Sequence, residues 1–273
     1  MINLFYAGNI KVFDGLLISL LSMSKHTKEE LNVYVLTMDL RELNADYLPI
    51  SDEQIAFLQN VIQKANTNSK ITKIDVTKEY HERFDNTKNK NTRCTPYTLL
   101  RLIAPHIEIL PDKIIYLDCD TIINNDIKEL YDINVDNYEA GVVRDIMFKN
   151  FVGFFNYFNA GVMLLNMTNI RKSGSFDKAA NLCVTKKLAF ADQDALNNSI
   201  KKRLMIPYKF NWFRKRCKYH DWIVVHHLCN ARETGNIHHR IKPWHTDLFV
   251  QSFPEYKPLI DEFLELKKEY NEQ

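Results

Sequence analysis

The feature that most constrains the fold is the apolar run Ile114-Ile115-Tyr116-Leu117, which is followed directly by Asp118-Cys119-Asp120. Successive side chains of a β-strand point to opposite faces of the sheet, so a strand that is apolar at every position is buried on both faces. Such strands lie in the middle of mainly parallel sheets that carry helices on both sides. The run therefore predicts an α/β fold with residues 113–117 as a central strand.

The first half of the chain alternates strand and helix patterns, as expected for βαβ units. Ser51 predicts the start of the second helix, and Glu53 and Gln54 add acceptors near its first turn. The stretch 81–94 is polar and irregular, and Thr95-Pro96 predicts the start of a helix that carries Arg101. The expected strands are 2–7, 33–36 and 71–76, and the expected helices are 12–24 and 52–65.

The second half continues with strands, helices and a charged amphipathic helix over the last twenty residues. Thr168 or Asn169 is expected to cap one of these helices. With 273 residues and no repeat or Gly-rich linker, we expect one domain over 1–250 and a helical tail over 251–273. The expected helices are 126–131 and 192–200, and the expected strands are 140–143, 158–166, 205–207 at a sheet edge and 222–227.

Composition excludes several classes of protein. Lys and Arg number 36 against 34 Asp and Glu, so no long-range field would recruit nucleic acid. The 5 cysteines lack CxxC spacing, which argues against a disulfide framework and a zinc cluster and favours reduced thiols. The N-terminus lacks a signal-peptide pattern, and no apolar run is long enough to span a bilayer. A cytoplasmic protein is expected.

Asp118 and Asp120 carry the clearest chemical signal. Residues two apart on an extended chain point the same way, and strand ends in α/β sheets face the ligand crevice. Both carboxylates are therefore placed to bind one hard cation, such as Mn²⁺ or Mg²⁺, together with a nucleotide diphosphate. The alternative from the residues alone is that Asp118 caps a turn and Asp120 forms an Asx-turn.

Residues 113–120 resemble the D-x-D strand of the family 8 glycosyltransferases, and further matches follow in order from about residue 2 to 245. The resemblance implies a GT-A fold, with a single Rossmann-like, mixed and mainly parallel sheet flanked by helices. It also implies a retaining, metal-dependent transfer of a hexose, glucose or galactose, from a UDP-sugar to a saccharide or glycolipid acceptor. Oligomeric state is not implied.

The other site residues are assigned by the resemblance of short segments, 5–9, 97–102, 144–145, 158–162 and 191–197. Each segment has a structural alternative: a Gly turn at Asn9, a solvated helix residue at Arg101, a turn at Asp145 and a helix-dipole partner at Asp192. The resemblance implies Asp192 and Gln193 as catalytic residues, and Ala7, Asn9, Arg101, Asp118, Cys119, Asp145, Asn159, Ala160, Gly161 and Lys242 as donor-binding residues.

The third metal ligand comes from Val224 to Cys229, which, with the later Lys242-Pro243-Trp244, is similar to the family's metal-binding histidine and K-P-W. The register leaves His226 and His227 as options, and strand alternation favours His227. The chain departs from the family pattern by an insertion, 231–241. Its Arg232, His238, His239 and Arg240 are expected either to contact phosphate or acceptor or to form a solvated loop.

Segment 208–222 mixes aromatic and basic residues and is the expected acceptor or membrane-surface segment, unless its rings pack on the core. Peripheral contact with the inner face of a membrane is therefore included in the expected location. Two other functions remain open. One is a metal-dependent phosphatase or nucleotidyltransferase that uses Asp118 and Asp120, and the other is a catalytically weak relative that binds UDP-sugars.

Overall fold

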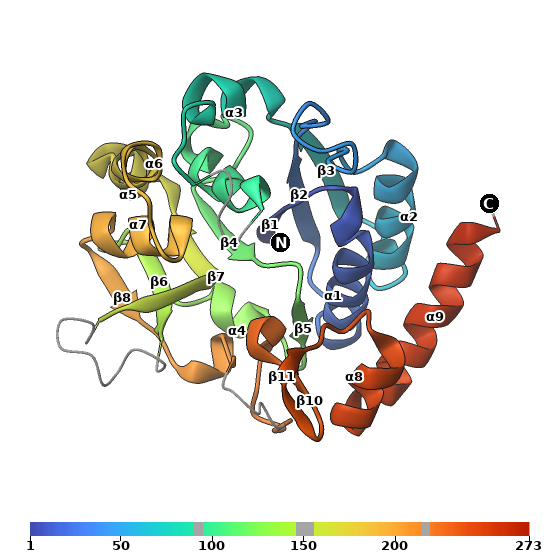
Figure 1. Ribbon diagram of the computed structural model, residues 1–273. Coiled ribbons are helices and arrows are strands. Elements are labelled where there is room, and N and C mark those ends of the chain that lie inside the picture. Colours follow the sequence, from blue (N-terminus) through green and yellow to red (C-terminus); the bar gives the residue numbers. More distant parts are fainter. Residues whose placement is uncertain (90–94, 146–155, 214–218, 273) are drawn as a thin grey trace.

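A seven-stranded sheet forms the centre of the molecule (Figure 1). The computed structural model describes residues 1–89, 95–145, 156–213 and 219–272. All strands of the sheet run in one direction except β7, which is antiparallel to both of its neighbours, β4 and β6. The order is β3 (Lys70–Asp75), β2 (Leu31–Thr37), β1 (Ile2–Ala7), β4 (Lys113–Leu117), β7 (Phe158–Asn166), β6 (Ala140–Arg144) and β8 (Arg203–Met205).

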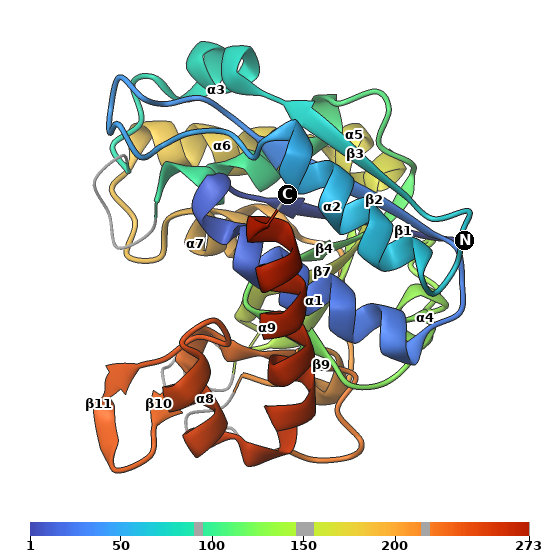
Figure 2. The same cartoon turned by 90° about the vertical axis from the view of Figure 1, so that its right-hand side faces the viewer.

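The apolar run 114–117 is buried on both faces of the sheet, as predicted. Ile115 and Leu117 belong to one hydrophobic cluster, and Ile114 and Tyr116 belong to the other. Two groups of helices cover the two faces (Figures 1 and 2), which confirms the α/β class. The first group is α1 (Phe13–His26), α2 (Asp52–Gln63) and α9 (Lys257–Asn271), and the second includes α3 (Thr77–Phe84), the 3₁₀ helix η2 (Pro96–Leu102), α5 (Met167–Ser173), α6 (Ser175–Thr185) and α7 (Ala191–Ser199).

Two expectations for local structure were wrong. Helix α3 extends to Phe84, because Tyr80 and Phe84 bury one narrow stripe of an otherwise polar segment. Helix α5 is capped by Asn166, whose side chain accepts the backbone N–H of Asn169, and not by Thr168 or Asn169. The expected helix that carries Arg101 begins at Pro96, with Thr95 at the N-cap position, as predicted, and it is a 3₁₀ helix. Residues 90–94, also expected to be irregular, lie outside the described residues.

The late buried strand is shorter than predicted and lies outside the main sheet. It is β9 (Val225–His227), and it pairs with β5 (Thr121–Ile123), which the sequence pattern did not reveal. The insertion 231–241 forms a hairpin of β10 (Arg232–Glu233) and β11 (Asn236–Arg240). The remaining short elements are α4 (Lys128–Tyr131), α8 (Thr246–Ser252), η1 (Ile10–Val12), η3 (Ala104–His106), η5 (Tyr208–Phe210), η6 (Leu228–Asn230) and η7 (Pro254–Tyr256).

Helix α9 packs along α1 (Figure 2). The rings of Phe13 and Tyr270 lie 4.7 Å apart, and Lys267 forms an ion pair with Asp14. Within the described residues, no helix is long and apolar enough to cross a membrane. The boundary at residue 250 between a domain and a tail stays a prediction.

The start of α2 provides a test of the capping analysis. The Ser51 hydroxyl accepts the backbone N–H of Gln54, and the Gln54 side chain accepts that of Ser51, as the sequence predicted. Ser51→Ala should therefore lower the free energy of unfolding by about 1 kcal/mol, measured by urea denaturation. Thr67→Ala, at an exposed loop position, should change it by less than about 0.5 kcal/mol. Equal effects of the two changes would contradict the capping role.

Candidate functional site

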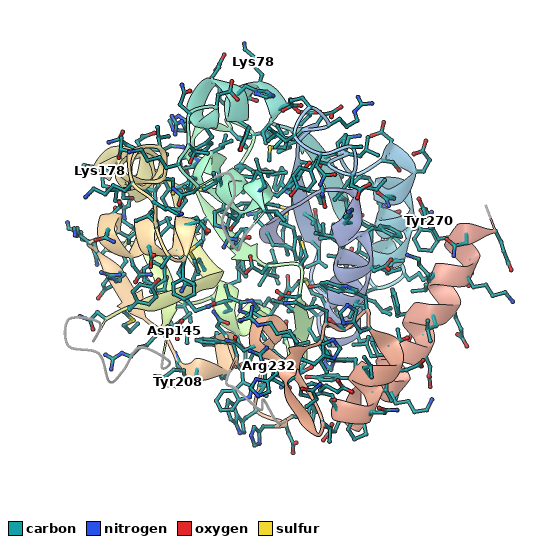
Figure 3. The ribbon with its side chains drawn as sticks, viewed as in Figure 1. Lys78, Asp145, Lys178, Tyr208, Arg232 and Tyr270 are labelled. Carbon is teal, nitrogen blue, oxygen red and sulfur yellow. The ribbon has the colours of Figure 1, made fainter. Side chains whose placement is uncertain are left out.

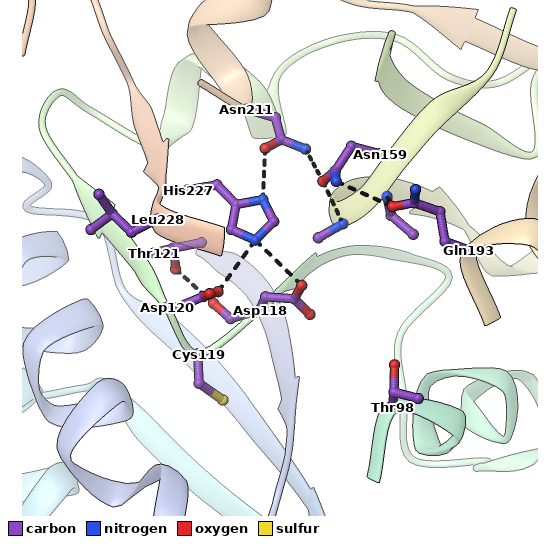
Figure 4. Close-up of polar contacts among 12 residues, drawn as sticks. Thr98, Asp118, Cys119, Asp120, Thr121, Asn159, Gln193, Asn211, His227 and Leu228 are labelled. Atoms are coloured by element: carbon purple, nitrogen blue, oxygen red, sulfur yellow. Dashed lines mark hydrogen bonds and ion pairs between the residues drawn. The ribbon is translucent and has the colours of Figure 1, made fainter. Parts of the chain in front are cut away.

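Strand pairing brings the two aspartates and His227 together. Asp118 and Asp120 lie between β4 and β5, and Thr121 at the start of β5 pairs with His227 at the end of β9. The backbone N–H of Leu228 donates to the carbonyl of Asp120 at 2.9 Å, which fixes the turn against β9. Side chains from two segments far apart in the sequence therefore meet at the carboxyl end of β4 (Figure 4).

One oxygen of each carboxylate converges on the same imidazole nitrogen. Nε2 of His227 lies 3.4 Å from Oδ2 of Asp118 and 3.2 Å from Oδ1 of Asp120. The three ligand atoms lie within 4.8 Å of one another. In Figure 4, the Cys119 side chain points away from this group, as alternation along the chain requires.

The other oxygen of each carboxylate is held by a cation. Oδ1 of Asp118 accepts from Arg101 at 2.9 Å and from the Tyr116 hydroxyl at 2.5 Å. Oδ2 of Asp120 accepts from Lys242. Burial alone would raise the pKa of both carboxyl groups, but Arg101 beside Asp118 and Lys242 beside Asp120, together with His227, hold each pKa below its ordinary value. Both groups are therefore anionic at neutral pH.

A relay of side-chain amides determines which imidazole nitrogen carries the proton. The backbone N–H of Gly161 donates to Oδ1 of Asn159 at 3.0 Å, so this oxygen can only accept. Nδ2 of Asn211 donates to the same oxygen at 2.9 Å, which turns Oδ1 of Asn211 toward Nδ1 of His227 at 3.0 Å. Nδ1 must therefore carry a hydrogen, and the lone pair of neutral His227 lies on Nε2.

This tautomer leaves a place for a cation between His227 and the two carboxylates. Nε2 is buried and has no hydrogen bond of acceptable geometry. A lone pair facing two anionic oxygens is stable only if a proton or a cation lies between them. Burial alone would lower the pKa of His227, but Cys229, Asp120 and Asp118 raise it well above the ordinary value. Two carboxylates and one imidazole fit Mn²⁺ or Mg²⁺.

The alternative ligand, His226, points to the opposite face of β9. Its Nδ1 lies 2.7 Å from the Tyr256 hydroxyl, and burial lowers its pKa to about 3. The geometry therefore favours His227, as the alternation argument predicted.

Glycine is required at position 161 by its surroundings. A Cβ atom there would lie 2.1 Å from Cε1 of His227 and 2.7 Å from Oδ2 of Asp118. The backbone at Gly161 therefore approaches the side chains of His227 and Asp118 too closely for any larger residue.

A cavity of about 310 Å³ opens beside the carboxylates and His227. Five predicted residues are not among the described residues that line this cavity: Ala7, Asn9, Cys119, Asp120 and Lys242. Asp120 contacts the lining residue His227, and Lys242 forms an ion pair with Asp120. The Asn9 side chain accepts from the backbone N–H of Lys11, which is a turn-capping contact. Nine predicted residues line the cavity: Arg101, Asp118, Asp145, Asn159, Ala160, Gly161, Asp192, Gln193 and His227.

Arg101 is buried, so the alternative of a solvated helix residue is wrong. Only 6% of the residue is exposed, and its guanidinium bonds to Asp118 at 2.9 Å, Asp192 at 3.1 Å and the carbonyl of Ala160 at 2.8 Å. It also lies over the ring of Tyr116, 4.3 Å from the centroid. Through these contacts Arg101 positions the carboxylates of Asp118 and Asp192.

Asp192 and Gln193 lie in the first turn of α7 and line the same cavity as Asp118 and His227. Asp192 is buried and accepts from the Thr98 hydroxyl at 2.6 Å, and burial raises its pKa although Arg101 opposes this. Oε1 of Gln193 accepts from Asn159 and from the backbone of Ala160, both at 3.1 Å. The preceding Ala191 has φ of 38°, a strained conformation for alanine.

Asp145 follows β6 and is buried at the cavity wall; Figure 3 labels it. Several further wall residues were not predicted, because a single hydroxyl, ring, thiol or amide carries no sequence signal of its own: Thr98, Phe190, Cys229 and Asn230. The relay residue Asn211 was also missed as a site residue.

Asn211 lies in the aromatic and basic segment 208–222. Phe210, Trp212 and Phe213 of this segment are buried, whereas Trp222 is 48% exposed and packs edge-on against Trp212. Residues 214–218 lie outside the described residues. Core packing therefore accounts for most of the described rings.

Comparisons with known proteins agree with this architecture. A provisionally named glycosyltransferase of Haemophilus influenzae is 26% identical over 222 residues, which are 77% of this chain and 63% of that protein. The chain thus spans less than two thirds of that relative's length. Escherichia coli lipopolysaccharide 1,2-glucosyltransferase is 22% identical over 95% of this chain and 78% of that protein.

Solved structures share the fold. An active-site mutant of LgtC superposes with a TM-score of 0.72 at 20% identity, over 98% of this chain and 96% of that one. The galactosyltransferase LgtC in complex with donor and acceptor sugar analogues gives 0.70, also at 20% identity, over 96% of each chain. The fold is therefore GT-A. The family model for glycosyl transferase family 8 matches residues 3–247, and the chain belongs to that family.

Proposed function

We propose that this chain is a retaining, metal-dependent hexosyltransferase that moves glucose or galactose from a UDP-sugar to a saccharide or lipid-linked acceptor. The observation that carries the proposal is the convergence of Asp118, Asp120 and His227 on one point at the wall of a cavity. Asp192 and Gln193, to which the family resemblance gives a place near the reacting sugar, line the same cavity.

The relatives support the chemistry of both substrates. LgtC was solved with donor and acceptor sugar analogues, and the Escherichia coli relative is named for glucose transfer to lipopolysaccharide. We extend a nucleotide-sugar donor and a saccharide or glycolipid acceptor to this chain, together with a cytoplasmic location that includes peripheral contact with the inner face of a membrane.

Asp118, Asp120 and His227 would hold the divalent cation, which supplies positive charge to the diphosphate as the nucleotide leaves. Asn211 keeps the lone pair of His227 on Nε2, and Arg101 keeps Oδ1 of Asp118 engaged so that Oδ2 faces the site. Lys242 does the same for Asp120 and places a further positive charge beside the leaving group.

At the sugar end, Asp192 places a buried negative charge where positive charge develops on the anomeric carbon. Gln193 is fixed by Asn159 and the backbone of Ala160, so its amide presents a rigid polar surface to the sugar. Asp145 is the proposed partner of a sugar hydroxyl. Membership of family 8 leaves the phosphatase or nucleotidyltransferase alternative without support, and the complete ligand set argues against a weak binder.

The first prediction concerns Asp120. Asp120→Asn removes the anionic ligand and should abolish Mn²⁺-dependent binding of UDP in calorimetry, a loss of more than roughly 100-fold. Asp132→Asn, which changes an exposed carboxylate paired with Lys128, should bind as the unmodified protein does. If the unmodified protein binds no UDP with any divalent metal, the proposed function is wrong.

The second prediction concerns the tautomer of His227. Asn211→Leu removes the acceptor for the Nδ1 hydrogen, so Mn²⁺ affinity should fall by about 10- to 100-fold although Asn211 is not a ligand. Asn211→Asp keeps an acceptor and should retain most of the affinity. Asn181→Leu, at an exposed site on α6, is the matched control. Equal affinity of Asn211→Leu and the unmodified protein, with both folded by circular dichroism, would contradict the relay.

The third prediction is a pH dependence. Because the metal-free site raises the pKa of His227 above 6.5, Mn²⁺ must displace a proton, and its affinity should rise with pH until that pKa is passed. Without metal, the contribution of protonated His227 to stability is complete below pH 6.5 and is lost as the pH rises through the folded-state pKa.

Calorimetry in two buffers of different ionisation enthalpy at pH 7 measures the proton released, which should be about one per Mn²⁺. His239→Gln, which changes an exposed imidazole of the hairpin, should leave this number unchanged. Enthalpies that do not depend on the buffer would show that no proton occupies the metal position.

A further inference from the structure

The β10–β11 hairpin joins the metal group to Lys242 and borders the cavity. It follows His227 by a single 3₁₀ turn, η6, and ends directly before Ile241 and Lys242. In Figure 2 it projects toward the side at which β1 ends, which is the side of the site. Arg240, the last residue of β11, lines the same cavity as Asp118 and Gln193.

Arg240 lies directly opposite Arg232 in this hairpin. Directly opposed residues of an antiparallel pair extend to the same face, and like charges in such positions are destabilising. The hairpin's single acidic residue, Glu233, is engaged by His239 at 2.7 Å. In the described part of the chain, neither guanidinium forms an ion pair with a carboxylate. The fold thus places two unneutralised arginines opposite each other in the hairpin, and one of them, Arg240, lines the cavity.

The guanidinium of Arg232 also lacks part of its hydrogen bonding. Its Nη1 donates to the carbonyl of Ala231 at 3.3 Å, but its Nε is buried and has no hydrogen-bond partner. Burial and the neighbouring Arg240 lower its pKa. A local conflict of this kind in a natural sequence is expected at functional sites, where a ligand resolves it.

The charges around the cavity indicate what that ligand is. The carboxylates of Asp118, Asp120, Asp145 and Asp192 are opposed by two engaged cations, Arg101 and Lys242, and a bound divalent cation would balance the remainder. A nucleotide diphosphate then adds one negative charge on each phosphate. Two further positive charges restore neutrality, and Arg232 and Arg240 are two guanidinium groups suited to phosphate oxygens.

We infer that Arg232 and Arg240 bind the diphosphate of the nucleotide-sugar donor, so that the hairpin insertion completes the donor site. The inference rests on the proposed function. An anionic group on the acceptor has the same phosphate chemistry, but charge balance is reached with the donor alone.

The test is calorimetric titration of the full chain, with Mn²⁺, by UDP, inorganic pyrophosphate and uridine. Arg232→Gln and Arg240→Gln should each lower the affinity for UDP and for pyrophosphate by about 10-fold. The double variant should lower both affinities by about 100-fold. Uridine, which has no phosphate, should bind all variants equally. Arg240→Lys keeps the charge and should stay within a few-fold of the unmodified protein.

Two control variants separate local from general effects. His238→Gln changes an exposed residue of the same strand, and Lys201→Gln removes an exposed charge elsewhere, so both should bind UDP normally. If the unmodified protein binds UDP and the double variant, folded by circular dichroism, binds it equally well, the inference is overturned while the proposed function stands. An anionic acceptor would then be the remaining partner for the two arginines. Absence of UDP binding by the unmodified protein would overturn both.

Discussion

The site depends on the electrostatic compensation of two carboxylates at the end of a buried strand. Asp118 and Asp120 are largely shielded from water, and each keeps its charge because one oxygen is neutralised by Arg101 or Lys242. Removing a buried partner of this kind costs far more than a surface ion pair contributes, because the remaining charge is left uncompensated. The second oxygen of each carboxylate is therefore left to face Nε2 of His227 and does not pair with another cation.

The backbone determines the protonation of the site through the side-chain amides of Asn159 and Asn211. The N–H groups of Gly161 and Ala160 cannot change roles, so they fix the orientation of Asn159 and Gln193. Asn159 in turn fixes Asn211, and Asn211 fixes the proton on His227. One strand start thereby orients both the cation side and the sugar side of the cavity.

The sequence was sufficient for the parts of the molecule that local patterns determine. The central strand, the α/β class and the position of Asp118 and Asp120 follow from an apolar run that ends in carboxylates. The cap at the start of α2, formed by Ser51 and Gln54, could also be predicted from the sequence. The start of the helix that carries Arg101 was predicted, but its 3₁₀ type and strand β5 were not, because three-residue periods and three-residue strands leave no usable pattern.

Site residues could likewise be predicted only where a local pattern of the sequence marks them. Residues in segments similar to the family could be named, and most of them border the cavity. Asn211 and the burial of Arg101 depend on contacts between segments far apart in the chain, which no local pattern encodes. The pairing of Arg232 with Arg240 arises from the hairpin that the insertion forms, and no local pattern predicted this pairing. The turn of the hairpin and most of β11 are exposed, as expected for a solvated segment.

The reversed direction of β7 has a consequence for how this site can vary. Because β7 runs against β4, its first residues meet the last residues of β4, and the register that pairs Leu117 with Val162 sets the separation between Asp118 and Asn159. A shift by one residue would exchange the two faces of β7, so the smallest slide that preserves the core is two residues, about 7 Å. The separation between Asp118 and Asn159 is therefore adjustable only in steps, and gradual change must come from side chains and loops.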